Sequence, residues 1–299
     1  MPKASIAHLF SCLLPARTTR GRLFLSALLA GLGALCSAQV PGPKVEGWKL
    51  VWSDEFNAPN GSSVDPSKWI IETGGEGWGN DELEYYTDRP SNIFLRDGNL
   101  VIRALAEKYP ASGPKSRNYT SGRMKTQGKF SQTYGRFEAR IKVPFGQGMW
   151  PAFWMLGDDI DKVGWPACGE VDIMENIGKE PSIVHGSIHG PGYTGAVGIE
   201  APFTLTSGRH FADDYHVFAV EWDPDSIAFY VDENLYVKRT RADLKPDWKW
   251  AFDKPFFLIL NLAVGGDWPG SPDSSTHFPA EMLVDYVRVY QRIPPPAPR

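Results

Sequence analysis

The sequence is poor in cysteine. It has three cysteines among 299 residues, and only Cys168 lies beyond residue 38. If residues 1–38 are cleaved as a signal segment, no intramolecular disulfide can form, so the fold must be held by its core, with or without a metal. A single cysteine of this kind is expected to be a small buried hydrophobe rather than a reactive thiol.

Three other features are missing. The sequence has no internal repeat, no glycine-rich phosphate loop after a strand, and no long amphipathic helix. Short runs of alternating apolar and polar residues, separated by turns, are present instead and are typical of strands. Aromatic residues are abundant, with 11 Trp, 11 Tyr and 16 Phe. The pattern predicts an all-β sandwich of two antiparallel sheets.

Residues 1–38 have the features of a secretory signal. Basic residues precede an apolar run from Leu23 to Leu35, which is short for a membrane span, and the small residues 36–38 suit cleavage. Cleavage removes four of 31 basic and none of 35 acidic residues, leaving 27 − 35 = −8. We therefore expect a secreted or periplasmic protein with a neutral ligand, without nucleic acid and without a membrane after cleavage.

An acidic strand is predicted within residues 169–178. Alternation with β-branched residues puts Glu170 and Asp172 on one face, whereas Glu175 is out of phase by one residue. A β-bulge would return Glu175 to the same face. Three carboxylates on one face repel each other and lose hydration, an arrangement that folds keep where the charge is used. A solvated acidic face on an exposed strand is the alternative.

The chemistry that suits these acids is glycoside hydrolysis. A retaining glycosidase uses two carboxyl groups about 5–5.5 Å apart, one as nucleophile and one as proton donor. The long side chains of Glu170 and Glu175 can lean toward each other. Asp172 lies between them, where it can share a proton and separate their pKa values.

The acidic stretch resembles the active-site strand of glycoside hydrolase family sixteen, in its bulged, laminarinase-like form. The resemblance extends from about Trp52 to Tyr290, and it implies a concanavalin-like jelly roll whose bent sheet forms a concave substrate cleft. The catalytic domain is expected over 48–292, after the signal peptide (1–38) and a linker (39–47) and before a proline-rich tail (293–299). The family pattern Glu-x-Asp-x-x-Glu after Trp-Pro-x-x-Gly is met by Trp165, Pro166, Gly169, Glu170, Asp172 and Glu175.

The resemblance also implies an activity and a set of roles. The expected protein is a secreted endo-β-1,3-glucanase, a monomer that hydrolyses laminarin-type or mixed-linkage β-glucans with retention and needs no catalytic cofactor. Glu170 would be the nucleophile and Glu175 the proton donor. Asp172 would tune both, and His189 matches the family's histidine near the proton donor.

Six residues are expected to bind the sugar chain. Trp150 and Trp154 share one face of a predicted strand, where indoles can stack on sugar rings. The resemblance adds loop or cleft-edge positions, and the full set is Asn80, Arg123, Trp150, Trp154, Trp165 and Trp268. The alternatives are core packing for each Trp, an ordinary surface loop for Asn80 and a structural counter-ion role for Arg123.

A structural calcium ion away from the cleft is a further expectation from the resemblance. Asp285 is in phase with Leu283 and Val287, and an acid in the apolar phase of a strand needs a partner or a metal. The implied ligands are oxygens of Glu55, Gly98 and Asp285, which suit calcium.

Two kinds of rival function remain open. Relatives of the implied fold include transglycosylases and enzymes that cut galactans. The same kind of sandwich also serves as a sugar-binding protein without turnover, although the presence of both Glu170 and Glu175 favours an enzyme.

Overall fold

The computed structural model describes residues 46–110 and 116–294. The predicted signal peptide, most of the predicted linker and residues 295–299 lie outside this part. Within it, none of the helices is long and apolar enough to span a membrane.

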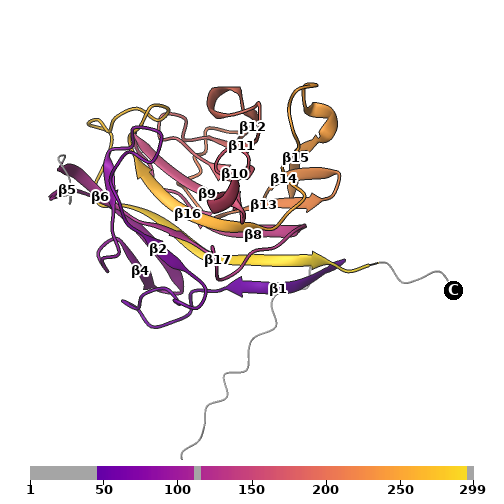
Figure 1. Cartoon of the computed structure of the whole chain (residues 1–299). Helices are drawn as coiled ribbons and strands as arrows, with labels where there is room; N and C mark the ends of the chain where they lie inside the picture. Colours follow the sequence, from indigo (N-terminus) through magenta and orange to yellow (C-terminus); the bar gives the residue numbers. More distant parts are fainter. Residues whose placement is uncertain (1–45, 111–115, 295–299) are drawn as a thin grey trace, which may run out of the picture. The chain divides into compact units, whose positions relative to one another are not determined.

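The described residues form two stacked β-sheets, with few helical turns, as predicted (Figure 1). The outer sheet has ten strands: β1 (Trp48–Asp54), β3 (Glu84–Tyr86), β4 (Ile93–Arg96), β5 (Asn99–Tyr109), β6 (Arg117–Ser121), β8 (Gly135–Lys142), β13 (His216–Asp223), β14 (Ser226–Val231), β15 (Asn234–Thr240) and β17 (Ala280–Arg292).

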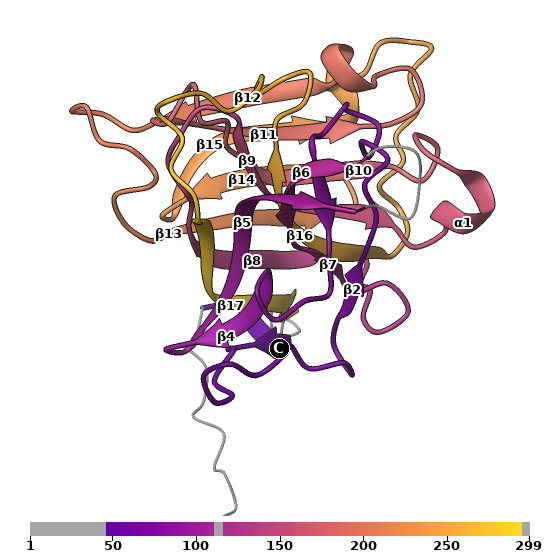
Figure 2. The ribbon, with the colours of Figure 1, turned by 90° about the vertical axis from the view of Figure 1, so that its left-hand side faces the viewer.

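The inner sheet has seven strands, in the spatial order β12-β11-β10-β9-β16-β7-β2 (Figure 2). Their bounds are β2 (Ile70–Glu72), β7 (Arg123–Lys125), β9 (Met149–Gly157), β10 (Glu170–Glu175), β11 (Ile183–His189), β12 (Ile199–Thr204) and β16 (Phe256–Val264). The helical turns are α1 (Ile160–Val163), η1 (Gly195–Val197) and η2 (Arg241–Asp243).

The core lies between the two sheets. Period-2 alternation sends Phe137 and Ala139 of β8 and Val171 and Ile173 of β10 into one buried cluster. Burial of such apolar side chains is the main source of stability in a chain whose described part contains a single free cysteine, Cys168. The opposite face of the inner sheet is left for polar residues.

Among the described strands the pairing is antiparallel with one exception. β3 pairs with β6 in parallel, with Glu84 opposite Tyr119 and Tyr86 opposite Ser121. The predicted sandwich of two antiparallel sheets is therefore confirmed, with one parallel pair at this edge. β17 contributes most to the outer sheet, since it pairs with β8 and also with β5 and β1.

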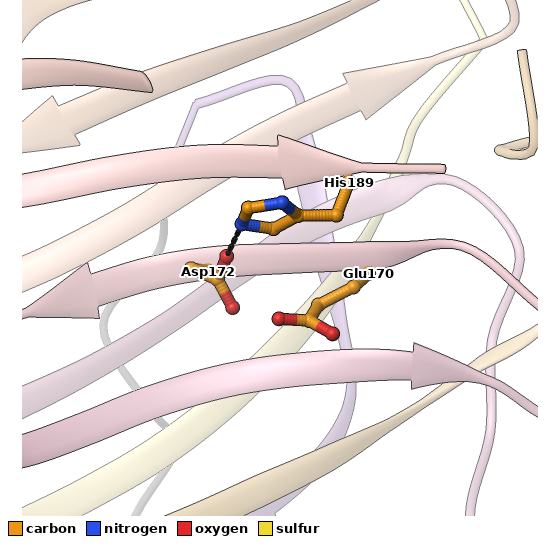
Figure 3. Close-up of side chains that lie close together, drawn as sticks. All are labelled: Glu170, Asp172 and His189. Atoms are coloured by element: carbon orange, nitrogen blue, oxygen red, sulfur yellow. Dashed lines mark ion pairs between the residues drawn. The ribbon is translucent and has the colours of Figure 1, made fainter. Parts of the chain in front are cut away.

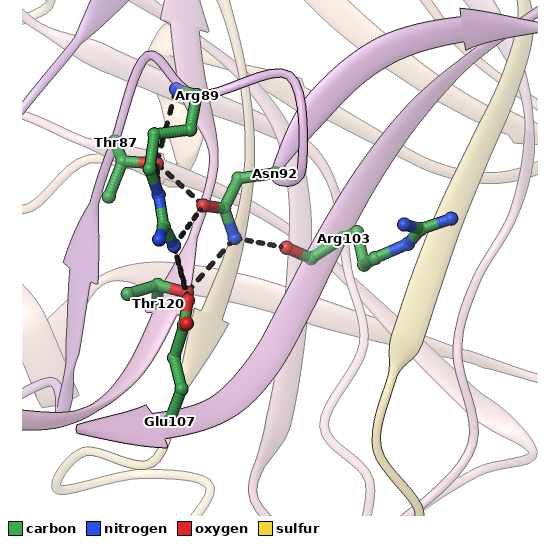
Figure 4. A network of polar contacts seen from close by, with 6 residues as sticks. All are labelled: Thr87, Arg89, Asn92, Arg103, Glu107 and Thr120. Atoms are coloured by element: carbon green, nitrogen blue, oxygen red, sulfur yellow. Dashed lines mark hydrogen bonds and ion pairs between the residues drawn. The ribbon is translucent and has the colours of Figure 1, made fainter. Parts of the chain in front are cut away.

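A polar network fastens the chain after β3 to β5 and β6 (Figure 4). The guanidinium of Arg89 donates to Asn92 and to Thr120, each at 2.9 Å, and forms an ion pair with Glu107. The amide of Asn92 donates to the Arg103 carbonyl oxygen at 2.9 Å. Because most of these groups are partly or fully buried, they satisfy one another and fix the position of β3 beside β6.

The side chain of Asp285 in β17 points to the other face of the sheet than expected. β17 has a register shift between Val284 and Tyr286, so Asp285 does not point into the core with Val287. Its carboxylate is half-exposed and pairs with Arg140 at 2.8 Å. The expectation that Asp285 occupies the apolar phase is wrong, because the irregularity changes the phase within the strand.

Candidate active site

The predicted irregularity in the acidic strand is present. Asp172 pairs with Trp154 of β9 and Met174 with Phe153, so Ile173 is the extra residue of a bulge. After it, Glu175 pairs with Ala152, which is two residues from Trp154 and therefore on the same face. The bulge thus brings Glu170, Asp172 and Glu175 to the face of the inner sheet that points away from the core.

Two indole N–H groups point at the two glutamates. Trp165 donates through Nε1 to Glu170 Oε2 at 2.7 Å. Trp150 donates through Nε1 to Glu175 Oε1 at 3.0 Å. A hydrogen bond of this kind favours the ionised carboxylate and fixes its orientation. Trp150 and Trp165, two of the residues predicted to bind the sugar chain, therefore also hold the acids.

Asp172 and His189 form the centre of the cluster. The imidazole Nε2 lies 3.1 Å from Asp172 Oδ2, and Glu170 lies beside this pair (Figure 3). Carboxylate oxygens of Glu170 and Asp172 and a nitrogen of His189 all lie within 4.8 Å of one another. The register explains this, since Glu170 is opposite His189 on the neighbouring strand β11.

Burial raises the pKa of all three carboxyls. The pKa of Glu170 rises to about 8 through burial and the charge of Asp172, while His189 and Trp165 oppose the rise. The pKa of Asp172 rises to about 7, mainly through burial. The pKa of Glu175 is well above its usual value because of burial and the charges of both other carboxylates. The cluster therefore holds protons at neutral pH and shares them among its members.

Arg123 and Trp154 form a second group on the same face. The guanidinium lies between the rings of Trp78 and Trp154, at 4.6 and 4.8 Å from their centroids. It donates through Nε to Glu72 at 2.6 Å, while Trp154 Nε1 donates to Asn261 at 2.7 Å. Planar groups are thus held in fixed orientations next to the acidic cluster.

The other predicted sugar-binding residues lie on two neighbouring loops. Asn80 donates to Glu82 at 3.2 Å, and its carbonyl oxygen accepts from the Asp267 amide at 2.9 Å. Trp268 packs edge-on against Trp150, with ring centroids 5.5 Å apart. The structure therefore brings Trp268 and Trp150 together beside Glu175.

Cys168 is fully buried, two residues before Glu170. Burial and the charge of Glu170 raise the pKa of its thiol to about 11. A thiol of this kind stays protonated and unreactive. The expectation of a buried hydrophobe is confirmed.

Three residues near the site were missed. Glu72 anchors Arg123, Asn261 holds Trp154, and His185 lies opposite Glu175 on β11. The alternation of His185 with His189 in the sequence was the available signal for His185. Glu72 and Asn261 lie on strands far away in sequence, and no local pattern marks them.

The fold and this site define a class of protein. In this β-sandwich, the sheet face that points away from the core carries two glutamates, an aspartate and ordered indoles. These are the groups that a glycosidase uses to bind and cleave a sugar chain.

Comparisons with known proteins give the family. Residues 78–288 match the family model described as glycosyl hydrolases family 16. The beta-glucanase of Rhodothermus marinus is 43% identical over 282 residues, which are 91% of this chain and 94% of that protein. The chain belongs to glycosyl hydrolase family 16.

Solved structures agree with this assignment. The endo-beta-1,3-glucanase of Pyrococcus furiosus has a TM-score of 0.79 and 49% identity over 82% of this chain and 95% of its own. The laminarinase catalytic domain of Thermotoga maritima has a TM-score of 0.79 and 47% identity, over 83% of this chain and 100% of its own. The predicted fold class and family are confirmed.

Proposed function

We propose that this chain is a secreted endo-β-1,3-glucanase that hydrolyses laminarin-type or mixed-linkage β-glucans with retention of configuration. The observation that carries the proposal is the placement of Glu170 and Glu175 on one sheet face, each held by an indole N–H. The names of the relatives support the glucan substrate, and the features of residues 1–38 support secretion.

The first step uses both glutamates. Glu170 attacks the anomeric carbon while Glu175 gives its proton to the leaving glycosidic oxygen, so a glycosyl-enzyme ester forms and the leaving sugar departs with a hydroxyl group. Burial and the charges of Asp172 and Glu170 raise the pKa of Glu175 well above its usual value, which supports its role as donor. Trp165 stabilises the ionised form of Glu170.

The second step returns the enzyme to its starting state. Glu175, now a carboxylate, takes a proton from water, and the resulting hydroxide-like oxygen attacks the anomeric carbon and releases Glu170. Two inversions give net retention. Asp172 and His189 lie within 4.8 Å of Glu170 and adjust how charge is divided between the acids.

Proton NMR of the first product formed from laminarin tests the mechanism, and product sizing tests endo action. A β-anomer appearing first and a spread of product lengths are expected. An α-anomer appearing first would remove Glu170 as nucleophile. If the wild-type protein binds laminarin but releases no reducing ends, it is a sugar-binding sandwich. If it only lengthens oligosaccharides, it is a transglycosylase.

We also propose a structural calcium ion near Glu55, Gly98 and Asp285. Strand register supports it, because Asp54 pairs with Val287 and Leu100 with Val284, which brings the three residues to neighbouring positions along β17. The side chains of Glu55 and Asp285 are paired with Arg288 and Arg140, so backbone carbonyl oxygens would have to supply ligands or these pairs would have to open.

Calorimetric melting with calcium and with a chelator tests this site. A lower midpoint in chelator is expected, since an ion bound to the folded state stabilises it. An unchanged midpoint would rule out a stabilising ion.

A further inference from the structure

His185 is held between two carboxylates. Its ring is buried on β11, with Nδ1 in hydrogen-bonding contact with Glu200 of β12 and Nε2 3.2 Å from Glu180. A neutral imidazole has one N–H and can donate to one of these acceptors. The doubly protonated ring donates to both, so the surroundings select the imidazolium.

The charges around His185 agree with this state. Burial alone lowers the pKa of His185, but the hydrogen bond and charge of Glu200, with the charges of Glu175 and Glu180, raise it overall. The pKa of Glu200 is lowered, first by the hydrogen bond from His185. The ammonium of the nearby Lys179 donates to the Trp268 carbonyl oxygen at 2.8 Å, so Lys179 holds the backbone of the tryptophan that His185 packs against.

The ring of His185 packs on an aromatic chain that ends at the proton donor. His185 meets Trp268 edge to face, with centroids 5.0 Å apart and an interplanar angle of 72°. Trp268 meets Trp150 in the same way at 5.5 Å and 87°. Trp150 then donates to Glu175 at 3.0 Å. An imidazolium is attracted by the π-system of an indole, and this attraction favours the contact of His185 with Trp268.

We propose that His185, clamped as an imidazolium between Glu180 and Glu200, is a positioning residue that holds Trp268 against Trp150 and thereby forms the sugar-binding wall on the leaving-group side. This inference rests on the glycosidase function proposed above. Glu175 protonates the leaving oxygen, so the departing sugar lies on its side, next to Trp150 and Trp268. The hydrogen bonds of His185 in the described part go to Glu180 and Glu200 and not to Glu170, Asp172 or Glu175, so it acts through the two indoles.

Two substrates separate this role from a merely structural one. Laminarin places a sugar on the leaving-group side, whereas a nitrophenyl glycoside of a β-1,3-linked glucose disaccharide has an activated leaving group and no sugar there. For His185→Gln we expect kcat/KM to fall about tenfold on laminarin and less than about twofold on the nitrophenyl glycoside, because misplacement of a binding wall affects the substrate that uses it. An equal loss on both substrates or no loss on laminarin would overturn the proposal. A shift of the alkaline limb of kcat against pH on laminarin would also overturn it, because the charge of His185 would then act on Glu175 directly.

Two further variants keep the test independent of folding. Glu200→Gln preserves shape but removes one charge, and it should shift the ratio of the two substrates in the same direction by a smaller factor. His216→Gln is the matched control, because His216 is also buried and bound to a carboxylate, Asp232 at 2.6 Å, but lies on the outer strand β13. A substrate ratio unchanged in Glu200→Gln, or changed in His216→Gln, would contradict the proposal.

Proton NMR titration of the histidine rings tests the clamp without catalysis. The signal absent from His185→Gln identifies His185 among the six histidines of the full sequence, of which five lie beyond residue 38. We expect it to remain in the imidazolium form above the ordinary midpoint of about pH 6.5, and to titrate at lower pH in Glu200→Gln. Titration of the wild-type ring at or below pH 6.5 would overturn the clamp. A wild-type protein that cleaves no β-glucan would instead refute the proposed function, and the NMR result would still decide the clamp.

Discussion

The indole of Trp150 donates a hydrogen bond to the carboxyl of Glu175, with Nε1 3.0 Å from Oε1. The two residues lie on the paired strands β9 and β10, and the bulge at Ile173 makes their meeting possible. A residue expected to form a flat surface for sugar is thus also bonded to the group proposed to donate the proton.

Replacement of Trp150 by Phe removes this N–H and keeps an aromatic ring. The hydrogen bond lowers the pKa of Glu175, so its loss should raise that pKa further and move the alkaline limb of kcat against pH to higher pH. We expect a fall in kcat of about tenfold. Trp154→Phe is the control, because its N–H donates to the neutral Asn261. A pH profile that shifts equally in both variants would contradict this assignment.

Glu170 and Glu175 should respond differently to external nucleophiles. Both Glu170→Ala and Glu175→Ala should lose about 10³-fold or more in kcat on laminarin. With an activated aryl glycoside and added azide, Glu175→Ala should recover turnover and give a β-glycosyl azide, whereas Glu170→Ala should give the α-glycosyl azide, because each retains the opposite partner. Mass spectrometry and NMR of the products distinguish them. Exchanged stereochemistry between the variants would reverse the two roles.

Asp172→Asn should stabilise the protein at alkaline pH. The folded-state pKa of Asp172 is about 7, above its ordinary value of 3.8, so between these values the folded state holds a proton that the unfolded state has lost. Stability contributed by this group therefore falls as pH rises through that window. We expect the variant to melt about 3 °C higher than wild type at pH 8 and to show no such gain at pH 4.

Calorimetry at both pH values checks the sign of this effect. Asp65→Asn is the control, because Asp65 is exposed and its pKa is lowered by hydrogen bonds from Ser67. If the melting temperatures of Asp172→Asn and the wild type differ by the same amount at pH 4 and pH 8, the pKa of Asp172 is not raised in the folded state.

Gly198 leaves room for the His189 ring. A Cβ at position 198 would lie 2.2 Å from Cε1 and 2.5 Å from Nδ1 of His189. Gly198→Ala should therefore push the imidazole away from Asp172 and lower kcat about tenfold with little change in KM. Val197→Ala changes the exposed neighbouring side chain and should be neutral. Equal activity of both variants and the wild type would mean that the position of His189 is unimportant for turnover.

The sequence was informative where a charge pattern and a strand period conflict. Glu175 stands one residue out of phase with Asp172, and a bulge is the simplest irregularity that reconciles them. The similar irregularity in β17 was hidden, because apolar residues occur on both sides of Asp285 and no charge pattern reveals the change of phase. Period-2 reasoning therefore placed Asp285 on the wrong face.

Contacts between residues on different strands determine the positions of the other side chains of the site. His185 reaches Glu200 across the β11–β12 pair, and Arg123 reaches Glu72 across β7 and β2. Glu200 and Glu72 are ordinary polar residues within their own segments, so the sequence does not mark them as partners. The parallel contact of β3 with β6 has the same origin, since tertiary contacts rather than a local turn determine it.

The threefold pairing of β17 has a consequence for biogenesis. This strand comes last of the strands that the structure describes, yet it lies in the middle of the outer sheet, between β8 on one side and β5 and β1 on the other. Until it is synthesised, those strands expose unpaired backbone to one another and to other molecules. Premature termination within Ala280–Arg292 should therefore yield insoluble rather than weakened protein.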